Sequence, residues 1–274
     1  MQPISTIARL RERLSGEGLV AFVPTMGNLH EGHLKLMHEA RKHANCVVAS
    51  IFVNPLQFGP TEDFDRYPRT LKEDCERLEG LVDAVFAPSV SEMYPEKQTI
   101  YIDLPRLASE LCGAARPGHF RGMATVVLKL FNIVQPQIAL FGKKDYQQLF
   151  LVRQMTSQLN LPITIIGCET ARDDDGLALS SRNQYLTEAE RAEAPFLYRT
   201  LQGLKKRMLE GERDMERLER EATESLTRRG WQADYVEIRN QSDLGKPCNR
   251  DLVVLAAAKL GKTRLLDNIE IDLA

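Results

Sequence analysis

The stretch Pro24-Thr25-Met26-Gly27-Asn28-Leu29-His30-Glu31-Gly32-His33 joins two segments of different periodicity. Residues 19–23 before it are continuously apolar, which predicts a buried strand. Residues 34–43 after it have the periodicity of a helix. The stretch is therefore predicted to turn from a strand into a helix, which is where an open α/β sheet presents its binding crevice.

Two glycines and two histidines give this turn its chemistry. Gly27 and Gly32 let the backbone approach a ligand, and His30 and His33 would share one face of a helix start. Free N–H groups and the helix dipole favour an anion there, and imidazoles can donate hydrogen bonds to phosphate or a proton to a leaving oxygen. A zinc site is disfavoured because it needs three or four ligands and His-Glu-x-x-His is absent. Two solvated histidines are the other alternative.

The chain continues to residue 168 with strand-like and helix-like segments in alternation. Strand-like runs occupy residues 46–53, 83–88, 99–104, 137–141 and 163–168. Helical patterns occupy residues 4–14, 69–81, about 124–134 and the stretch after Gln148 to about Leu159. This alternation predicts an α/β fold with a parallel sheet.

The pattern changes after a boundary that we place near residues 172–184. Helix-forming, charged segments and then strand-like runs follow, at residues 187–210, 214–229, 235–238, 252–257 and 264–271. Gly261-Lys262-Thr263 is predicted to be a hairpin turn rather than a Walker loop, because Ala256 stands where that motif needs glycine. Helices followed by strands, without βαβ alternation, predict a small α+β domain.

Polar side chains follow two of the predicted strands at their carboxyl ends. Asn54 and Gln57 follow the strand at 46–53, although ordinary turn polarity explains them equally well. Residues 142–148 form a second junction between a strand and a helix, with lysines suited to phosphate and Asp145 suited to a ribose hydroxyl.

Two further loops carry basic and hydroxyl groups. Residues 116–123 place two arginines and a histidine before a helix, which indicates a carboxylate or phosphate site or, more simply, solvated surface. The serines and Arg182 of residues 172–183 are suited to gripping a polyphosphate, and a solvated interdomain loop is the alternative.

Composition excludes several classes of protein. The 274 residues are 43% hydrophobic and 27% charged, as in ordinary globular domains, and the formal net charge is −2. This charge gives no indication of nucleic-acid or membrane binding. The five cysteines are scattered, without Cys-x-x-Cys, which predicts reduced thiols in the cytoplasm. No apolar run approaches the roughly 18 residues of a membrane span and no signal-peptide core is present, so we expect a soluble intracellular protein.

Five blocks of the sequence, taken together and in order, resemble the pantoate–β-alanine ligases, also called pantothenate synthetases. The blocks are residues 24–33, 51–59, 116–123, 141–148 and 176–183, and the resemblance covers essentially the whole chain. His30-Glu31-Gly32-His33 resembles the His-x-Gly-His signature of the nucleotidyltransferase superfamily, which handles the α-phosphate of ATP. The resemblance implies a Rossmann-like parallel sheet of the nucleotidyltransferase fold at residues 1–175, binding ATP and pantoate, and a smaller C-terminal α+β lid domain at residues 176–274.

The resemblance also implies a homodimer and an ATP- and Mg²⁺-dependent reaction in two steps. Pantoate carboxylate attacks the α-phosphate of ATP and releases pyrophosphate, and the amine of β-alanine then attacks the pantoyl adenylate to give pantothenate and AMP. The enzyme needs no covalent nucleophile, because the substrate carboxylate already is one, so the protein aligns the reactants and neutralises phosphate charge. Mg²⁺ is expected mainly on the ATP phosphates. Glu73 or Asp74 would be its protein ligand, and a solvated helix face explains both equally well.

The resemblance assigns roles to individual residues, with His33 as the proton donor to the departing group. The expected catalytic residues are His33, His30, Lys144 and Arg182. The expected ATP-binding residues are Met26, Gly27, Asn28, Leu29, His30, Glu31, Gly32, His33, Gly142, Lys143, Lys144, Asp145, Ala171, Leu179, Ser180, Ser181 and Arg182. The residues expected to hold pantoate are Gln57 and Gln148, with Asn54 nearby, and the position of Gln57 also faces the β-alanine site.

Two rival functions remain open from the sequence. One is an adenylyltransferase of the same fold that makes a dinucleotide cofactor, and the other is a nucleotide-binding module without catalysis. Asn54, Gln57 and the Gln147-Gln148 pair favour a small hydroxy acid over a dinucleotide product. An RNA-binding role has no support, because the sequence shows neither a basic stripe nor a stacking platform.

Overall fold

The computed structural model of the protein describes residues 1–60, 62–248 and 250–273. The chain divides into two compact units. The first comprises Met1–Gly142 and Gln148–Glu169, and the second comprises Lys143–Gln147 and Thr170–Ala274. The domain limits expected from the sequence, residues 1–175 and 176–274, stay a prediction.

The first unit is built on a five-stranded sheet in the order β3-β2-β1-β4-β5, with every neighbouring pair parallel. The strands are β1 (Val20–Thr25), β2 (Cys46–Ile51), β3 (Ala84–Phe86), β4 (Ile138–Gly142) and β5 (Thr164–Cys168). The predicted α/β class and parallel sheet are confirmed. Because parallel strands all point the same way, the turns that follow β1 and β2 lie at one edge of the sheet.

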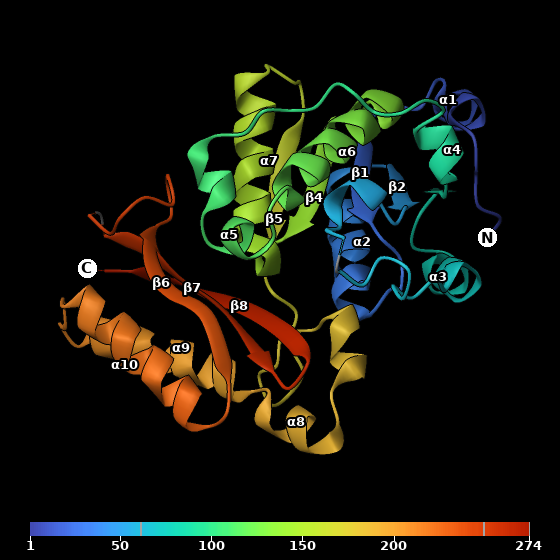
Figure 1. Ribbon diagram of the computed structural model, residues 1–274. Coiled ribbons are helices and arrows are strands. Elements are labelled where there is room, and N and C mark those ends of the chain that lie inside the picture. Colours follow the sequence, from blue (N-terminus) through green and yellow to red (C-terminus); the bar gives the residue numbers. More distant parts are fainter. Residues whose placement is uncertain (61, 249, 274) are drawn as a thin grey trace. The chain divides into compact units, whose positions relative to one another are not determined.

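Helices cover both faces of this sheet (Figure 1). They are α1 (Ile7–Leu14), α2 (Glu31–His43), α3 (Leu71–Leu78), α6 (His119–Val134) and α7 (Tyr146–Gln158). Alternate residues of β1 point to opposite faces, since Phe22 packs with Phe131 of α6, whereas Ala21 and Val23 share a second core cluster with Met37 of α2. Burial on both faces explains why the strands read as continuous apolar runs.

Shorter elements connect β3 to α6. They are α4 (Val90–Met93), the 3₁₀ turn η2 (Arg106–Ser109) and α5 (Cys112–Ala115), and the 3₁₀ turn η1 (Pro55–Gln57) follows β2. The prediction of a strand at residues 99–104 is wrong, because this segment is extended but pairs with no strand. Its alternating pattern has another cause: Ile102 and Leu104 pack against the core, whereas Ile100 is 79% exposed.

The long helix predicted at about residues 124–134 begins earlier than expected. Gly118 has a φ of +82° and precedes α6, which starts at His119. Only residues 116–118 of the basic stretch therefore form a loop, and the rest belongs to the first turn of a helix.

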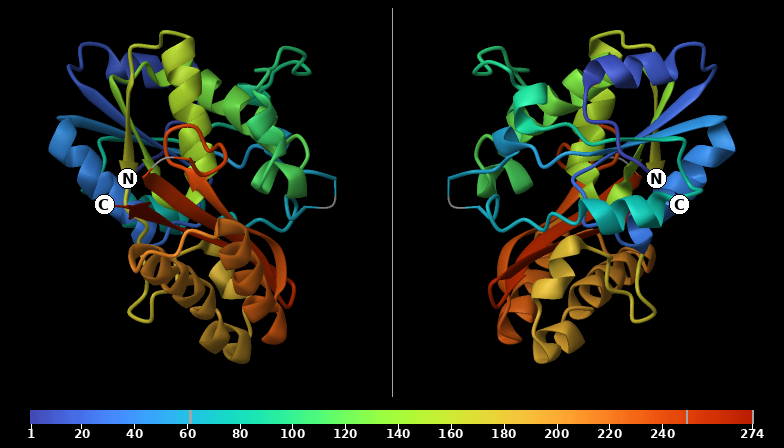
Figure 2. Two further views of the ribbon diagram at one scale, coloured as in Figure 1. Left: turned by 90° about the vertical axis from the view of Figure 1, so that its left-hand side faces the viewer. Right: turned by 90° about the vertical axis from the view of Figure 1, so that its right-hand side faces the viewer.

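The second unit is a three-stranded antiparallel sheet covered by helices. Its elements are η3 (Lys143–Asp145), η4 (Ser181–Tyr185), α8 (Glu188–Glu193), α9 (Phe196–Leu209), α10 (Met215–Arg228), β6 (Gln232–Asn240), β7 (Asp251–Leu260) and β8 (Thr263–Asp272). Figure 2 shows α9 and α10 (orange) lying against one face of the strands (red), where they bury Trp231 and Leu201. The α+β arrangement and the turn at residues 261–262 are confirmed. The helix predicted at 187–210 is two helices, because it is interrupted at Pro195, which has no backbone N–H to donate.

Candidate functional site

The turn after β1 places His30 and His33 against each other at the start of α2. Their ring centroids lie 4.1 Å apart. His30 is the N-cap residue, and its Nδ1 accepts a hydrogen bond of 3.1 Å from the N–H of Gly32. His33 Nδ1 accepts one of 3.3 Å from the N–H of His30. Because each Nδ1 accepts a hydrogen bond, the proton of each neutral ring lies on Nε2, which is therefore a donor.

Two backbone N–H groups in the first turn of α2 are engaged within the protein. The N–H of Gly32 is taken by the His30 ring, and the N–H of His33 donates to the carbonyl of His30 over 2.8 Å. The sequence suggested an anion site made of free N–H groups at a helix end. In the structure the Nε2–H groups of the two imidazoles are the better candidates for contacts to phosphate oxygens.

A buried carboxylate from α3 holds the same turn. Asp74 Oδ1 accepts a hydrogen bond of 2.7 Å from the N–H of Leu29, and Oδ2 accepts one of 2.9 Å from the N–H of Asn28. The hydroxyl of Thr70 also donates to Oδ2, over 3.1 Å. These bonds fix the two residues that directly precede His30.

The expectation of a solvated acidic face on α3 is correct for Glu73 and wrong for Asp74. Glu73 is exposed, whereas Asp74 is only 1% exposed. Asp74 stands four residues before Leu78, which is fully buried, so both side chains lie on the inner face of the helix. That spacing is the signal in the sequence that separates the two carboxylates.

Gly27 allows the turn to approach Asp74. Its φ is +83°, and a Cβ at this position would lie 2.9 Å from Asp74 Oδ2 and 3.0 Å from Ile51 Cγ2. A left-handed conformation and two close contacts together require glycine here. Asn28 follows with a φ of +50°, which asparagine tolerates better than most residues.

The polar turn after β2 is buried and hydrogen-bonded internally. Asn54 Nδ2 donates to Gln57 Oε1 over 3.1 Å and to the carbonyl of Gly122 over 3.2 Å. Asn54 Oδ1 accepts from the N–H of Leu56 over 3.3 Å and from the hydroxyl of Tyr94 over 2.7 Å. Burial raises the pKa of Tyr94, which keeps this hydroxyl a donor. The four bonds use both donors and both lone pairs of the Asn54 amide, so its place in the site is to orient Gln57.

Gln57 keeps part of its amide for a ligand. It is 7% exposed; Oε1 accepts from Asn54, and Nε2 contacts the sulfur of Met26 over 3.0 Å. Among the residues that the structure describes, no other group hydrogen-bonds to this amide, so one N–H and one oxygen lone pair remain. Met26 belongs to the histidine turn, so residues expected to bind ATP and pantoate meet here. Gln148, also expected to hold pantoate, is half-buried near the start of α7.

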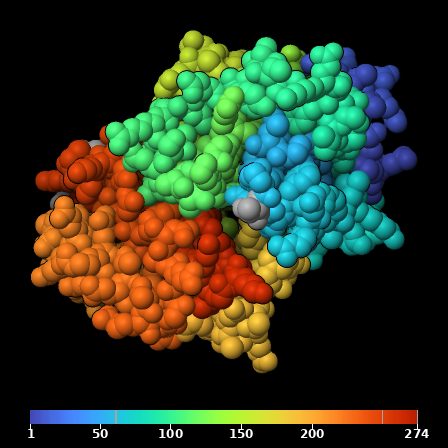
Figure 3. Space-filling model, in the orientation of Figure 1, coloured from blue at the N-terminus to red at the C-terminus, as the bar shows by residue number. Residues whose placement is uncertain are grey.

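The basic residues before α6 are paired within the first unit. Arg116 Nε and Nη2 lie 2.7 and 2.6 Å from Glu62 Oε1 and Oε2. Arg116 Nη1 lies 3.0 Å from His119 Nε2. In Figure 3 the cyan segment after β2 lies beside the green segment that precedes α6. Because Glu62 already meets the charge of Arg116, this loop is a weaker candidate for an anion site than the sequence suggested.

The second segment expected to bind ATP is held by β8. Asn268 Nδ2 donates to the carbonyl oxygens of Lys143 and Lys144, over 2.9 Å in each case. Lys143 Nζ pairs with Glu270 Oε2 over 2.7 Å, whereas no described residue forms an ion pair with Lys144. Lys144 is therefore the lysine whose ammonium is available to a phosphate, and Asp145 beside it is exposed. No local pattern in the sequence indicates this role of Asn268.

The third expected segment forms a closed loop. The N–H of Leu179 donates to the carbonyl of Ala171 over 2.9 Å, which pairs the two positions expected near the nucleotide. Ser180 is the N-cap of η4 and accepts a hydrogen bond of 3.2 Å from the N–H of Arg182. The serines and the arginine are thus presented together at the start of one short helical turn.

Arg172 anchors this loop to β8. Its Nη1 and Nη2 lie 2.6 and 2.8 Å from the two carboxylate oxygens of Asp267, which is 4% exposed. The guanidinium carbon also lies 3.5 Å from the centroid of the Tyr198 ring. A two-pronged ion pair with a stacked ring fixes the orientation of an arginine in a way that lysine does not reproduce.

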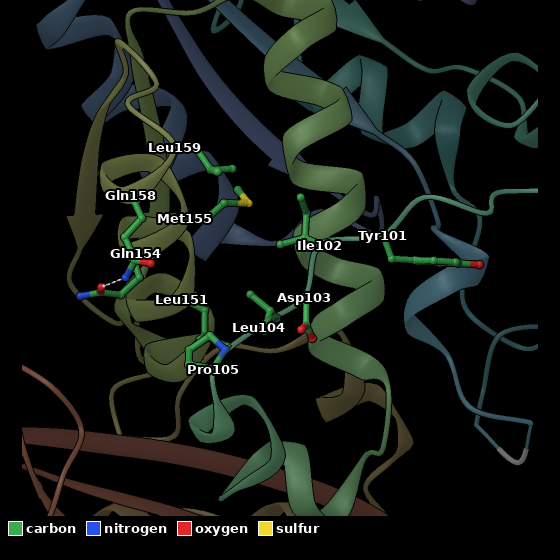
Figure 4. Close-up of a pocket in the computed structure, with 10 residues that line it drawn as sticks. All are labelled: Tyr101, Ile102, Asp103, Leu104, Pro105, Leu151, Gln154, Met155, Gln158 and Leu159. Atoms are coloured by element: carbon green, nitrogen blue, oxygen red, sulfur yellow. Dashed lines mark hydrogen bonds between the residues drawn. The ribbon is translucent and has the colours of Figure 1, made fainter.

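A cavity of about 230 Å³ in the first unit lies between the extended segment at residues 101–105 and α7. Figure 4 shows side chains of α7 on one side, including Leu151, Met155 and Leu159, and the extended segment on the other. None of the residues expected in the active site lines this cavity. The cavity is therefore not part of the candidate site.

The described residues contain no group of three or more histidine, cysteine, aspartate or glutamate side chains placed to hold a metal ion. Asp74 is committed to the histidine turn, and Glu73 is an isolated exposed carboxylate. The residues present do not form a protein cage for Mg²⁺, which binds oxygen ligands and often relies on substrate phosphates. In the described parts of the chain, no helix is both long and apolar enough to cross a membrane.

Known proteins resemble this chain over nearly its full length. The family model described as pantoate-beta-alanine ligase matches residues 2–270. A pantothenate synthetase of Methylobacillus flagellatus is 58% identical, and the match covers 98% of each chain. A crystal structure of pantoate-beta-alanine (pantothenate synthetase) from Thermus thermophilus is 44% identical with a TM-score of 0.94, covering 98% of this chain and 99% of that one.

A third relative is described together with small molecules. The crystal structure of pantoate-beta-alanine ligase from Francisella tularensis, complexed with beta-gamma ATP and beta-alanine, is 34% identical with a TM-score of 0.84. The match covers 98% of this chain and 97% of that chain.

Proposed function

The chain belongs to the pantoate–beta-alanine ligase family, and we infer that it condenses pantoate with β-alanine to give pantothenate, AMP and pyrophosphate. The observation that carries this conclusion is the family match over residues 2–270, with 58% identity to a pantothenate synthetase. The enzyme is accordingly an ATP-dependent ligase that joins an acid to an amino acid.

We propose that the reaction passes through a pantoyl adenylate. The carboxylate of pantoate forms a bond to the α-phosphorus of ATP, and the bond from that phosphorus to the pyrophosphate oxygen breaks. The Nε2–H donors of His30 and His33 are suited to the charge that grows on the departing oxygens, with His33 as the proton donor. The amine of β-alanine then attacks the acyl carbon and AMP leaves.

The remaining predicted residues take binding roles in this proposal. The unpaired ammonium of Lys144 neutralises phosphate charge, and Ser180, Ser181 and Arg182 bind the polyphosphate. The amides of Gln57 and Gln148 hold the hydroxy acid, because they donate to hydroxyl groups and accept from them without adding charge. We propose a lid role for the C-terminal α+β domain from family resemblance.

MgATP is the proposed form of the nucleotide substrate. The residues that the structure describes form no carboxylate cage, so we place Mg²⁺ on the phosphates of ATP rather than on Glu73 or Asp74. The Mg²⁺ concentration needed for full activity should then rise with the ATP concentration. A chelator should abolish turnover without changing the Tm of the protein in the absence of ATP.

We also propose a cytoplasmic homodimer. The dimer follows from family resemblance, and light scattering tests it, since the chain has a mass of 31.0 kDa and the dimer twice that. The five cysteines, all of which the structure describes, form no disulfide bond, which supports a reducing compartment. A monomeric mass at assay concentrations would contradict the dimer.

Pyrophosphate release from MgATP tests the function directly. Pantoate alone should trigger release, and AMP and pantothenate should appear after β-alanine is added. His33→Ala should lower the first step by about 10² or more, which is the usual contribution of a positioned acid. His38→Ala is the matched control, because His38 lies on the same helix and is exposed.

The outcomes separate the rivals. A same-fold adenylyltransferase would keep the AMP moiety in its product, and a binding module would release no pyrophosphate. Folded, ATP-binding protein that releases no pyrophosphate with pantoate would disprove the ligase function.

A further inference from the structure

The segment Arg116–Met123 has no role in the proposed reaction, yet the side chain of His119 within it contacts the turn that carries Gln57. His119 Nδ1 lies 2.8 Å from the backbone carbonyl oxygen of Gln57. Arg116 Nη1 lies 3.0 Å from the other ring nitrogen of His119, and Glu62 holds Arg116 by two hydrogen bonds. The four residues form one connected row.

The direction of each hydrogen bond in this row follows from chemistry. A guanidinium has only donors, so His119 Nε2 must accept from Arg116. The proton of the ring is then on Nδ1, which donates to the carbonyl of Gln57. Glu62 fixes the position of the guanidinium, and Arg116 in turn selects the tautomer of His119 that can hold Gln57.

Glu62, which is the residue of the row farthest from Gln57, is held in its ionised form. Burial alone would raise the pKa of the Glu62 carboxyl, but the hydrogen bond and charge of Arg116 outweigh burial and lower that pKa overall. The side chains of Arg116 and Glu62 are 18% and 22% exposed, so solvent screens this pair less than a fully exposed one.

The first turn of α6 also fits closely under the turn at residues 54–57. A Cβ on Gly122 would lie 2.0 Å from the carbonyl oxygen of Leu56 and 2.7 Å from the backbone nitrogen of Gln57. The carbonyl of Gly122 accepts a hydrogen bond from the Asn54 side chain. Gln57 is thus held by its side chain through Asn54 and by its backbone through His119.

We propose that Glu62, Arg116 and His119 are positioning residues that set the affinity of the site for the hydroxy acid by fixing the backbone of Gln57. The proposal rests on the proposed function, because Gln57 is the amide assigned to pantoate. These three residues touch neither substrate in the proposal; they act through the carbonyl of Gln57. Loss of the row should therefore weaken pantoate binding and leave ATP binding unchanged.

Two substitutions of His119 separate positioning from general stability. The amide nitrogen of an asparagine side chain reaches the position of Nδ1, so His119→Asn keeps the donor to Gln57. The amide of a glutamine reaches the position of Nε2, so His119→Gln keeps only the contact to Arg116. We expect His119→Gln to raise the KM for pantoate about tenfold and His119→Asn to stay within about twofold of wild type, because one hydrogen bond contributes roughly this much.

Further variants test the outer part of the row. Glu62→Gln should raise the KM for pantoate about threefold, with the KM for ATP within about twofold of wild type, since weakening an ion pair costs less than removing the bond itself. Glu17→Gln is the matched control, because Glu17 pairs with Arg13 on α1 and has no connection to Gln57. The Tm of every variant is measured alongside.

A spectroscopic measurement tests the row without turnover. ¹⁵N NMR of His119 should show the proton on Nδ1 in the wild type and a mixture of tautomers in Arg116→Met. The proposal is overturned if His119→Asn and His119→Gln have the same KM for pantoate. It is also overturned if the KM for pantoate and the KM for ATP rise together in a variant whose Tm falls. Wild-type turnover with pantoate in the same assay distinguishes failure of the row from failure of the proposed function.

Discussion

The N–H of Leu29 donates a hydrogen bond of 2.7 Å to the carboxylate of Asp74, although the two residues are 45 positions apart in the sequence. This bond joins the histidine turn to α3, a helix to which the proposed function assigns no contact with a substrate. The shape of the turn is therefore set in part by Asp74 of α3, and substitution of this residue should change catalysis although its side chain touches no substrate.

Asp74→Ala should lower kcat and destabilise the protein by about 2–4 kcal/mol, because it leaves two backbone N–H groups and one hydroxyl without their buried acceptor. Asp74→Asn should also be impaired, since an amide N–H would face a backbone N–H. Glu73→Gln is the control and should change neither kcat, Tm nor the Mg²⁺ requirement. A raised Mg²⁺ requirement in Glu73→Gln would instead support a metal role for that carboxylate.

Gly27→Ala should be more damaging than Gly80→Ala. Both glycines have a left-handed backbone, with φ of +83° and +79°, but a Cβ at position 80 meets nothing within 4 Å. Gly80→Ala should therefore cost about 1 kcal/mol for its backbone alone. Gly27→Ala adds the clash with Asp74 and should cost about 1–3 kcal/mol more. Denaturant unfolding measures the difference, and equal losses would show that the contact with Asp74 relaxes freely.

Lys144→Gln and Lys143→Gln should have opposite signatures, although the two lysines are neighbours. Lys144 has no carboxylate partner among the described residues, so its loss should lower kcat/KM for ATP by about 10² while the Tm stays unchanged. Lys143 pairs with Glu270, so its loss should mainly lower the Tm. The assignment of Lys144 to phosphate is wrong if Lys143→Gln has the larger kinetic effect.

Asn268→Ala should raise the KM for ATP about tenfold and leave the KM for pantoate within about twofold of wild type. The reason is the loss of two hydrogen bonds to the turn at residues 143–145, the lysine turn. Asn268→Asp should be at least as impaired, since its oxygens would face two carbonyl oxygens. Saturation kinetics with each substrate in turn measure this split. Equal changes in the KM for ATP and the KM for pantoate would contradict a role of Asn268 that is specific to the lysine turn.

The stability contributed by Glu62 should disappear in acid. Its pKa in the folded protein is lower than the ordinary value of 4.5, so the folded state gains stability above pH 4.5. That gain is lost as the pH falls through the lowered pKa. The Tm difference between wild type and Glu62→Gln should thus be constant near neutral pH and shrink below pH 4.5. A difference that grows in acid would mean that burial, rather than Arg116, dominates this carboxyl.

The sequence predicted those elements whose pattern follows directly from their burial. The strands β1, β2 and β4 are buried on both faces and read as apolar runs, so they were found. The segment at residues 99–104 has the alternation of a strand, but Ile102 and Leu104 pack on helices, and alternation does not identify the partner. The helix α6 begins at His119 because Gly118 directly before it has a left-handed backbone conformation. The composition of the segment alone does not indicate this start.

The supporting residues of the site were harder to predict than its ligands. His30, His33 and Lys144 lie in short motifs next to predicted strands, where local sequence carries the signal. Asn268 lies 124 positions from Lys144, and no local pattern connects them. Such pairs are set by the tertiary fold, so a single sequence reveals the residues proposed for chemistry more readily than those that position them.

The lysine turn belongs to the second unit, although the residues on both sides of it belong to the first. A chain cut after Glu169 would keep the whole parallel sheet and both histidines, but it would lose Asn268 and Glu270, which hold Lys143 and Lys144. No single cut between these units gives two pieces that each keep their own internal contacts. The two parts of the molecule are therefore not exchangeable modules. Because Asn268 and Glu270 of β8 hold the lysine turn, a substitution in one of these segments requires a matching substitution in the other.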